Sequence, residues 1–235
     1  MFLTEKVINN RYEALEQIGE GGMSVVWKAK DIENGNIVAI KILKRETTSN
    51  RIDDIIRFTN EANTISRLNI PEIVKVYEVG EIDNINYIVM EFIDGINMYE
   101  YLNKGNTFNF SECIQISIQI CEALKCVHNS GIIFRDLKPG NIILHKEKPI
   151  QIKLIDFGLS QVREFSSKNV NEIVGTFHYM SPEQSGVIKR NVDERSDLYS
   201  LGILLYQLFT NQLPFDGEDM NSIIHQHVER VLIWH

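Results

Sequence analysis

Residues 134–144 read Phe-Arg-Asp-Leu-Lys-Pro-Gly-Asn-Ile-Ile-Leu, and residues 153–158 read Lys-Leu-Ile-Asp-Phe-Gly. Asp136, Lys138 and Asn141 fall within six residues, and Asp156 follows twenty residues after Asp136. The Pro-Gly pair inside the first cluster cannot continue a regular helix, because proline lacks a backbone N–H and both residue types favour turns. We therefore expect a loop that directs these polar side chains toward one point.

Two β-prone runs, residues 142–144 and 152–155, lie on either side of the turn-like residues 147–149. This pattern predicts a β-hairpin. A hairpin would bring Asn141 and Asp156 to the same end of the structure. Their side-chain oxygens suit a hard divalent cation, and a neighbouring carboxylate and ammonium are what phosphoryl transfer needs.

The pattern Asp-x-Lys-x-x-Asn followed by Asp-Phe-Gly resembles the catalytic loop and metal-binding turn of eukaryotic-type (Hanks-type) protein serine/threonine kinases. The resemblance implies that Asp136 is the base that orients the acceptor hydroxyl and that Lys138 neutralises the transferring phosphoryl group. It implies that Asn141 and Asp156 hold Mg²⁺ or Mn²⁺ beside ATP. Lysine two residues after the aspartate is the form found in kinases that modify Ser and Thr.

The β-prone residues 12–19 and 25–29 are joined by Glu20-Gly21-Gly22-Met23-Ser24. Taken alone, this stretch is consistent with an ordinary hairpin. With Gly19 it resembles the kinase glycine-rich loop, in which backbone N–H groups approach phosphates without an intervening Cβ. Ser24 replaces the third glycine of the usual pattern, and Gly22 is an additional glycine.

Lys41 ends the apolar β-prone run Val38-Ala39-Ile40, so its ammonium group needs an anionic partner. The resemblance assigns it to the α- and β-phosphates of ATP. Residues 51–68 have helical periodicity, with Glu61 near the middle. Glu61 alone would be a solvated helix residue; in a kinase it pairs with Lys41 and fixes that side chain over the phosphates.

Residues 73–79 and 85–91 are predicted strands around a turn at Asp83-Asn84. Residues 91–95 then resemble the kinase hinge, where backbone groups meet the adenine edge. Met90 would guard the site behind the adenine or serve as plain core. The resemblance implies nucleotide-binding positions at Ile18, Gly19, Gly21, Gly22, Val26, Ala39, Lys41, Met90, Glu91, Ile93, Asn141, Ile143 and Asp156.

Two longer helices are predicted in the second half. Ser111 can cap a helix that runs to about Asn129 and ends at Gly131. A second helix has Ser196 as a candidate cap, and its leucines point to several sides, so it should be buried. By resemblance, Asp197 bonds to the backbone of the catalytic loop. A short helix is expected around residues 219–230.

Residues 134 and 135 carry two further implications of the resemblance. Phe134 occupies the usual histidine position, where an aromatic ring would preserve packing beside Phe157. Arg135 would receive a phosphate on the activation loop. We expect that phosphate on Ser166 or Ser167, placed by the chain itself, although these residues could equally serve only to solubilise the loop. Ser160 and Thr176 are the remaining hydroxyls of interest.

Residues 175–183 resemble the closing segment of the kinase activation region, with Ser181 in place of the commoner alanine. The resemblance implies that Thr176 contacts Asp136 and Lys138 and that Glu183 anchors the segment to the large lobe. Family members pair this glutamate with an arginine from later helices. Because the sequence given ends at His235, we expect either a fragment of a longer protein or an unusual closure of the large lobe, and we favour the fragment, with further domains.

Composition narrows the functional classes. The chain has 235 residues, 43% hydrophobic and 24% charged, with a net charge of −8. An acidic chain without a Lys/Arg block is a poor match for nucleic acid or an anionic membrane. The three cysteines, Cys113, Cys121 and Cys126, fall in one predicted helix and suggest reduced thiols in or near a core, hence a cytoplasmic protein. The uncharged residues 198–215 contain polar side chains and read as a buried helix and loop, not a membrane span.

Together these features predict an α+β, bilobed kinase-like fold, with a small antiparallel β lobe carrying one helix and a larger, mainly helical lobe. The expected organisation is an N-terminal extension at 1–11, an N-lobe at 12–92 and an incomplete C-lobe at 93–235. The expected activity is transfer of the γ-phosphate of ATP to Ser/Thr hydroxyls of proteins. A nucleotide-binding pseudokinase is the alternative, disfavoured by Lys41, Asp136 and Asp156. A small-molecule kinase is disfavoured by the closing segment at 175–183.

Overall fold

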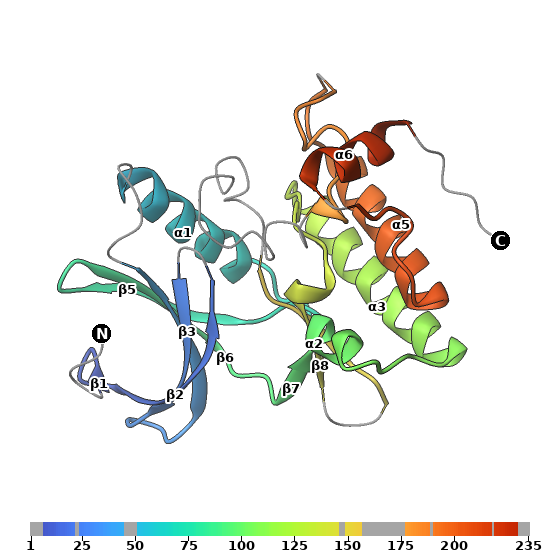
Figure 1. The fold of residues 1–235 in the computed structure, drawn as a ribbon. Coiled ribbons are helices and arrows are strands. Elements are labelled where there is room, and N and C mark those ends of the chain that lie inside the picture. Colours follow the sequence, from blue (N-terminus) through green and yellow to red (C-terminus); the bar gives the residue numbers. More distant parts are fainter. Residues whose placement is uncertain are drawn as a thin grey trace. The chain divides into compact units, whose positions relative to one another are not determined.

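The computed structural model of the chain describes residues 7–21, 24–44, 51–145, 149–156, 177–188, 190–217 and 219–229, without the side chains of Arg51, Asp53, Asp54, Arg57 and Glu61. The chain divides into two compact units, Met1–Asp94 and Gly95–His235 (Figure 1). The lobe boundary expected between residues 92 and 93 lies close to this division.

The first unit is a six-stranded antiparallel sheet with the order β1-β2-β3-β4-β6-β5 and one helix, α1 (Figure 1). The helix spans Arg51–Ser66, as the periodicity predicts. β5 begins at Val76, three residues later than predicted. Ile73 and Val74 are apolar and buried, as strand residues often are, but they lie before the strand. The strands are β1 (Val7–Ile8), β2 (Tyr12–Glu20), β3 (Ser24–Asp31), β4 (Ile37–Leu43), β5 (Val76–Ile82) and β6 (Ile85–Glu91).

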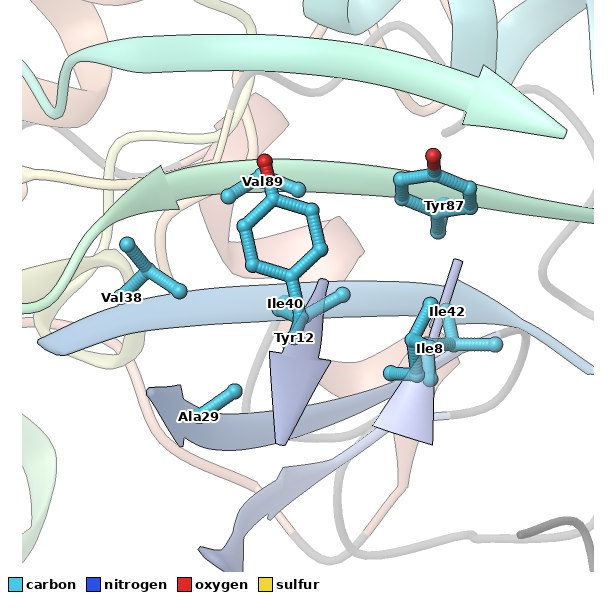
Figure 2. Close-up of a cluster of buried hydrophobic side chains, with 8 residues drawn as sticks. All are labelled: Ile8, Tyr12, Ala29, Val38, Ile40, Ile42, Tyr87 and Val89. Carbon is cyan, nitrogen blue, oxygen red and sulfur yellow. The ribbon is translucent and has the colours of Figure 1, made fainter. Parts of the chain in front are cut away.

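The two faces of β4 supply two separate cores. Val38, Ile40 and Ile42 alternate along the strand and face a buried cluster with Ile8, Tyr12, Ala29, Tyr87 and Val89 (Figure 2). Leu43 faces the opposite side, where it packs with Phe58 and Ala62 of α1 and with Ile88 of β6. Because side chains alternate along a strand, Lys41 shares this second face with Leu43.

The sheet of the first unit is curled. Tyr12 on β2 donates a hydrogen bond of 2.6 Å from its hydroxyl to Glu78 on β5, although three strands separate β2 from β5 in the sheet. Tyr87 on β6 donates to the other oxygen of the same carboxylate at 2.8 Å. Burial and the bond to Glu78 raise the pKa of Tyr87 to about 12. One carboxylate therefore joins side chains from three strands.

The second unit combines a three-stranded sheet, β7-β8-β9, with four α-helices among its described residues. The predicted small β-rich lobe with one helix and the larger, mainly helical lobe are confirmed. The elements are β7 (Gly95–Asn97), α2 (Met98–Asn103), α3 (Phe110–Asn129), the 3₁₀ turn η1 (Pro139–Asn141), β8 (Ile142–His145), β9 (Ile152–Leu154), α5 (Glu194–Thr210) and α6 (Met220–Glu229).

Both predicted helix caps were wrong, by two or three residues. Asn109 caps α3, accepting from the backbone N–H of Glu112, whose carboxylate in turn accepts from the backbone N–H of Asn109. This capping box satisfies two otherwise unpaired donors, and Ser111 lies inside the helix. Asp193 caps α5 by accepting from the backbone N–H of Arg195, so Ser196 is also interior.

Helix α5 is buried as predicted. Leu201, Leu204 and Leu208 are at most 7% exposed. Cys113 of α3 lies against this helix and donates from its thiol to the carbonyl of Leu208 at 3.2 Å. Cys121 and Cys126 are exposed on α3, which corrects their predicted place in or near the core. Within the described part of the chain, no helix is both long enough and apolar enough to cross a membrane.

Gly95 is required by the close approach of β7 and β8. A Cβ at this position would overlap the backbone carbonyl oxygen of Leu144, which cannot rotate away as a side chain could. We expect Gly95→Ala to lower the free energy of unfolding by about 1–3 kcal/mol, the usual cost of overpacking. Chemical denaturation followed by circular dichroism measures the change.

Gly202 of α5 provides the matched control for that substitution. A Cβ at Gly202 meets no atom within 4 Å, and alanine is the better helix former by about 1 kcal/mol. Gly202→Ala should therefore leave stability unchanged or raise it. Equal losses from the two alanine substitutions would contradict the close-approach explanation for Gly95.

His227 of α6 gives the second unit a stability that depends on pH. Its side chain is buried, and the Tyr199 hydroxyl lies 2.7 Å from Nδ1. Burial lowers the pKa of His227 from 6.5 to about 4. The unfolded chain therefore binds more protons between these values, so this contribution is complete above pH 6.5 and is lost as the pH falls toward 4.

We expect the free energy of unfolding to decrease by up to about 3 kcal/mol across this window through His227 alone. A His227→Gln variant should show a shallower pH dependence, because its side chain does not titrate. Denaturation curves at half-unit pH intervals measure both proteins. Parallel curves for the two proteins would show that His227 does not control the effect.

Candidate active site

The backbone of the predicted catalytic loop is anchored to α5. Asp197, only 1% exposed, accepts from the backbone N–H of Phe134 at 2.8 Å and from that of Arg135 at 2.7 Å. The imidazole Nε2 of His128, near the end of α3, lies 2.7 Å from the same carboxylate. The predicted bond between Asp197 and the loop is therefore present. Phe134 itself is fully buried, as its aromatic side chain favours.

The loop gathers Asp136, Lys138 and Asn141 around one carboxylate. Lys138 Nζ lies 2.9 Å from Asp136 Oδ2, and Asn141 Nδ2 donates to that same oxygen at 2.8 Å. Asn141 Nδ2 also donates to the backbone carbonyl of Asp136 at 2.8 Å. The short turn η1 sets this spacing. Pro139 is its first residue, and Lys138 before it is extended, as a residue that precedes proline tends to be. The carboxylate is thus fixed in orientation and partly exposed.

The predicted hairpin is present and ends beside this cluster. β8 pairs with β9 so that Ile142 lies opposite Leu154, and Ile155 N–H donates to the carbonyl of Asn141 at 3.1 Å. Asp156 directly follows Ile155, so the hydrogen bond between Ile155 and Asn141 brings the backbone of Asp156 close to Asn141. Asn97 holds the loop from β7 by donating to the Gly140 carbonyl at 2.6 Å. Of the predicted hairpin turn at residues 147–149, residues 147 and 148 lie outside the described residues.

Asn141 and Asp156 carry oxygen atoms near this end of the hairpin, and oxygen is the ligand type that hard divalent cations prefer. Asn141 uses its amide nitrogen for both bonds to Asp136, so its oxygen is the end that can bind a cation. Over the described ranges there is no cluster of three or more His, Cys, Asp or Glu side chains suited to a metal. An ion at Asn141 and Asp156 would take its other ligands from phosphate and water, as Mg²⁺ commonly does.

In the first unit, β4 fixes the position of Lys41. Lys41 pairs with Val26 of β3 and Ile88 of β6, and Ala39, 6% exposed, pairs with Met90. Glu61 belongs to α1, but its side chain lies outside the described residues, so its pairing with Lys41 stays a prediction.

The glycine-rich turn between β2 and β3 is held by a residue that the sequence did not reveal. Lys44 Nζ donates to the Glu20 carboxylate at 2.7 Å and to the Gly21 carbonyl at 2.8 Å. The bond from Lys44 lowers the pKa of Glu20. Gly21 N–H donates to the Ser24 carbonyl at 2.9 Å. Gly22 and Met23 lie outside the described residues.

The remaining predicted nucleotide positions lie on β2, β6 and β8 and between β6 and β7. The β2–β3 register is irregular at Ile18, between Gln17 and Gly19, and Ile18 is 45% exposed. Met90 packs partly against the core cluster at α1, so its side chain contributes to the core. Glu91 N–H donates to the Lys75 carbonyl at 2.8 Å. Ile93 is buried, and Ile143 pairs with Lys153 across the hairpin.

The segment after the activation region is fixed to α5. Glu183 accepts a hydrogen bond of 2.6 Å from the Ser196 hydroxyl, and the Tyr179 hydroxyl donates to Gln207 at 2.6 Å. Ser200 donates to the Tyr179 carbonyl at 2.7 Å. This segment therefore has three bonds to one buried helix. Phe157, Ser160, Ser166, Ser167 and Thr176 lie outside the described residues.

Comparison with known proteins identifies the family to which this arrangement belongs. The family profile described as "Protein kinase domain" matches residues 12–234. The chain belongs to the protein kinase family. The resemblance drawn from the loop, the hairpin and the glycine-rich turn is thereby confirmed.

The relatives of this kinase domain include bacterial serine/threonine kinases. A probable serine/threonine-protein kinase of Clostridium perfringens is 40% identical over 97% of this chain and 33% of its own length. PrkC of Bacillus subtilis is 38% identical over 97% of this chain and 34% of its own length. PknB of Mycobacterium tuberculosis is 36% identical over 96% of this chain and 36% of its own length. The kinase domain thus spans about a third of these relatives.

A solved structure supports the fold. The crystal structure of Rad53 residues 1–466 in complex with AMP-PNP has a TM-score of 0.73, with 29% sequence identity. The match covers 92% of this kinase domain and 53% of the Rad53 chain. The predicted kinase fold is confirmed by this likeness.

Four residues whose side chains hydrogen-bond to distant parts of the candidate site were missed by sequence reasoning: His128, Asn97, Gln184 and Lys44. Each acts through a bond to a residue at least 23 positions away. Such pairs leave no local pattern in a single sequence. Only the folded chain reveals them.

Proposed function

We propose that this kinase domain transfers the γ-phosphate of ATP to Ser and Thr hydroxyls of protein substrates. The observation that carries the proposal is the Asp136 carboxylate, oriented by Lys138 at 2.9 Å and Asn141 at 2.8 Å. A carboxylate fixed in this way can orient an acceptor hydroxyl and accept its proton. The neighbouring ammonium can neutralise charge on the transferring phosphoryl group.

The residues that would hold ATP and its metal follow from the family resemblance. Asn141 and Asp156 would bind Mg²⁺ or Mn²⁺, which supplies charge neutralisation at the phosphates. Lys41, fixed by Glu61, would bind the α- and β-phosphates, and the glycine-rich turn would contact them through backbone N–H groups. The hinge at residues 91–95 would meet the adenine. These roles are proposals for the present chain.

Autophosphorylation in the activation region belongs to the same proposal. Arg135 precedes the proposed base, and its Nε is buried with no hydrogen-bond partner in the described structure. A phosphate group on Ser166 or Ser167 would supply a strong acceptor for such a guanidinium. This supports phosphorylation of one of these serines, with Ser160 and Thr176 as the other candidate hydroxyls.

The wider setting is also proposed. Because the chain spans about a third of its relatives, we propose further domains in the same polypeptide. The three cysteines are free, as in proteins of the reducing cytoplasm, where we place the reaction. The substrates would be proteins with accessible Ser or Thr.

The test is transfer of labelled γ-phosphate from ATP to the chain itself and to a generic protein substrate, with Mg²⁺ and after its removal by a chelator. We expect transfer only with the metal, and mass spectrometry should place phosphate on Ser166 or Ser167. Nucleotide binding without any transfer would favour the pseudokinase and overturn the proposal. Transfer with both serines unmodified would overturn only the proposed modification sites.

A further inference from the structure

Gln184 connects the closing segment to the catalytic loop. Its Nε2 donates to the backbone carbonyl of Arg135 at 2.7 Å. Its Oε1 accepts from the backbone N–H of Ser181 at 3.0 Å and from the Ser181 hydroxyl at 2.8 Å. Ser181 is fully buried. A flipped amide would place its NH₂ group against the backbone N–H of Ser181 and its oxygen against the Arg135 carbonyl, so these two backbone groups select one orientation, while the Ser181 hydroxyl can donate or accept in either.

The peptide that Gln184 holds is the one that leads into Asp136. Arg135 has a φ of 69°, in the left-handed region that is unfavourable for residues with a Cβ. Such a conformation persists only when its surroundings fix it. The Asp197 carboxylate accepts from the backbone N–H of Arg135, and the Gln184 amide donates to the backbone carbonyl of Arg135, so both sides of this residue are fixed. That carbonyl and the N–H of Asp136 lie in one peptide plane, so the carbonyl bond sets the direction in which Asp136 leaves the loop.

We propose that Gln184, oriented by Ser181, is a positioning residue for the carboxylate of Asp136. The inference rests on the proposed function, because it assigns Asp136 as the base. Gln184 acts through the Arg135 peptide. Ser181, which replaces the commoner alanine of the family, contributes a hydroxyl that donates a second hydrogen bond to Gln184 Oε1, at 2.8 Å.

Two substitutions separate the hydrogen bond from simple packing. Gln184→Met keeps similar length and removes the donor, while Gln184→Glu keeps the shape and places a negative oxygen toward the Arg135 carbonyl. Small displacements of a reacting group can slow an enzyme up to about 100-fold. We therefore expect kcat to fall about 3- to 10-fold in Gln184→Met and about 10- to 100-fold in Gln184→Glu. The KM for ATP should change less than about twofold, because Gln184 acts on the acceptor side of the reaction.

Ser181→Ala provides a graded test. It removes the hydroxyl donor but keeps the backbone N–H bond to Oε1 at 3.0 Å. We therefore expect kcat to fall only about two- to threefold, less than in either Gln184 variant. A Ser181→Ala rate below that of Gln184→Glu would contradict this order and the role assigned to the amide.

Asn106 offers a matched control. Its side-chain amide also donates to a backbone carbonyl, that of Tyr101, at 3.0 Å and away from the catalytic loop. Asn106→Asp makes the same amide-to-carboxylate exchange and should leave kcat unchanged. A second readout, amide hydrogen exchange of residues 133–138 measured by mass spectrometry, should accelerate in Gln184→Glu and stay unchanged in Asn106→Asp.

The outcomes distinguish the proposed role of Gln184 from the proposed phosphate-transfer activity on which it rests. Unchanged kcat per folded molecule in Gln184→Glu would overturn the inference, and so would equal losses in Gln184→Glu and Asn106→Asp. A native chain that transfers no phosphate would overturn the proposed function instead. In that case, an unchanged rate of amide hydrogen exchange at residues 133–138 in Gln184→Glu would still show, independently of activity, that Gln184 does not stabilise the catalytic loop.

Discussion

We expect an Asp136→Asn variant to transfer phosphate at least about 100-fold more slowly than the native chain, the lower end of what a general base contributes. Asparagine has nearly the same shape as aspartate, but it carries no negative charge and does not accept a proton from the acceptor hydroxyl. Its oxygen can still accept the bond from Asn141, which spans 2.8 Å in the native chain. The fold should therefore persist while the chemistry fails. Initial rates with labelled ATP measure the loss.

The control for this prediction is nucleotide binding. Calorimetric titration with ATP and Mg²⁺ should give similar affinity for the native chain and Asp136→Asn, because the proposed phosphate and metal ligands are untouched. Lys41→Met should instead weaken binding of the phosphates, as the family resemblance implies. Native transfer rates in Asp136→Asn would show that this carboxylate is not the base.

We expect an Asp197→Ala variant to lose about 3–5 kcal/mol of unfolding free energy, the usual cost of removing one partner from a buried charged network. The carboxylate is 1% exposed and bonded to the backbone N–H groups of Phe134 and Arg135 and to His128. Alanine would leave these buried donors without an acceptor. The catalytic loop would lose its anchor on α5, so phosphate transfer should fall as well. Urea denaturation followed by circular dichroism measures the stability.

Two further variants keep this prediction testable if Asp197→Ala does not fold. Asp197→Asn retains one acceptor but turns an amide donor toward the loop, so we expect an intermediate loss of about 1–3 kcal/mol. Asp193→Ala removes the cap of the same helix and an exposed ion pair with Arg195, and it should cost about 1 kcal/mol without slowing transfer. A loss at Asp197 no larger than that at Asp193 would refute the anchoring role.

The sequence predicts the parts of the site that depend on local pattern. The Pro139-Gly140 pair predicts the loop, and the β-prone runs on either side of residues 147–149 predict the hairpin that the structure contains. The apolar run before Lys41 predicts β4, because alternating side chains there fill two cores. The loop, the hairpin and the strand each follow from a pattern a few residues long.

The sequence could not resolve choices that depend on distant partners or on geometry. Ser111 and Asn109 both suit a helix cap, and the pairing of Asn109 with Glu112 decides between them. Ile73 and Val74 have the apolar character of a strand, yet they are buried before β5 begins. Gln184 resembles a solvated loop residue until the fold places its amide 2.7 Å from the Arg135 carbonyl. Tertiary contacts determine each of these outcomes.

The Glu78 carboxylate has a consequence for how the first unit opens. It accepts from Tyr12, near the β1 edge of the sheet, and from Tyr87, beside the β5 edge. Both edges of a curled sheet thus depend on one side chain. Local opening of either edge breaks a hydrogen bond to Glu78 and so weakens the support of the other edge. The backbone amides of both edges should therefore exchange their protons in a single cooperative event. Strands at opposite ends of the sheet order would behave as one thermodynamic element.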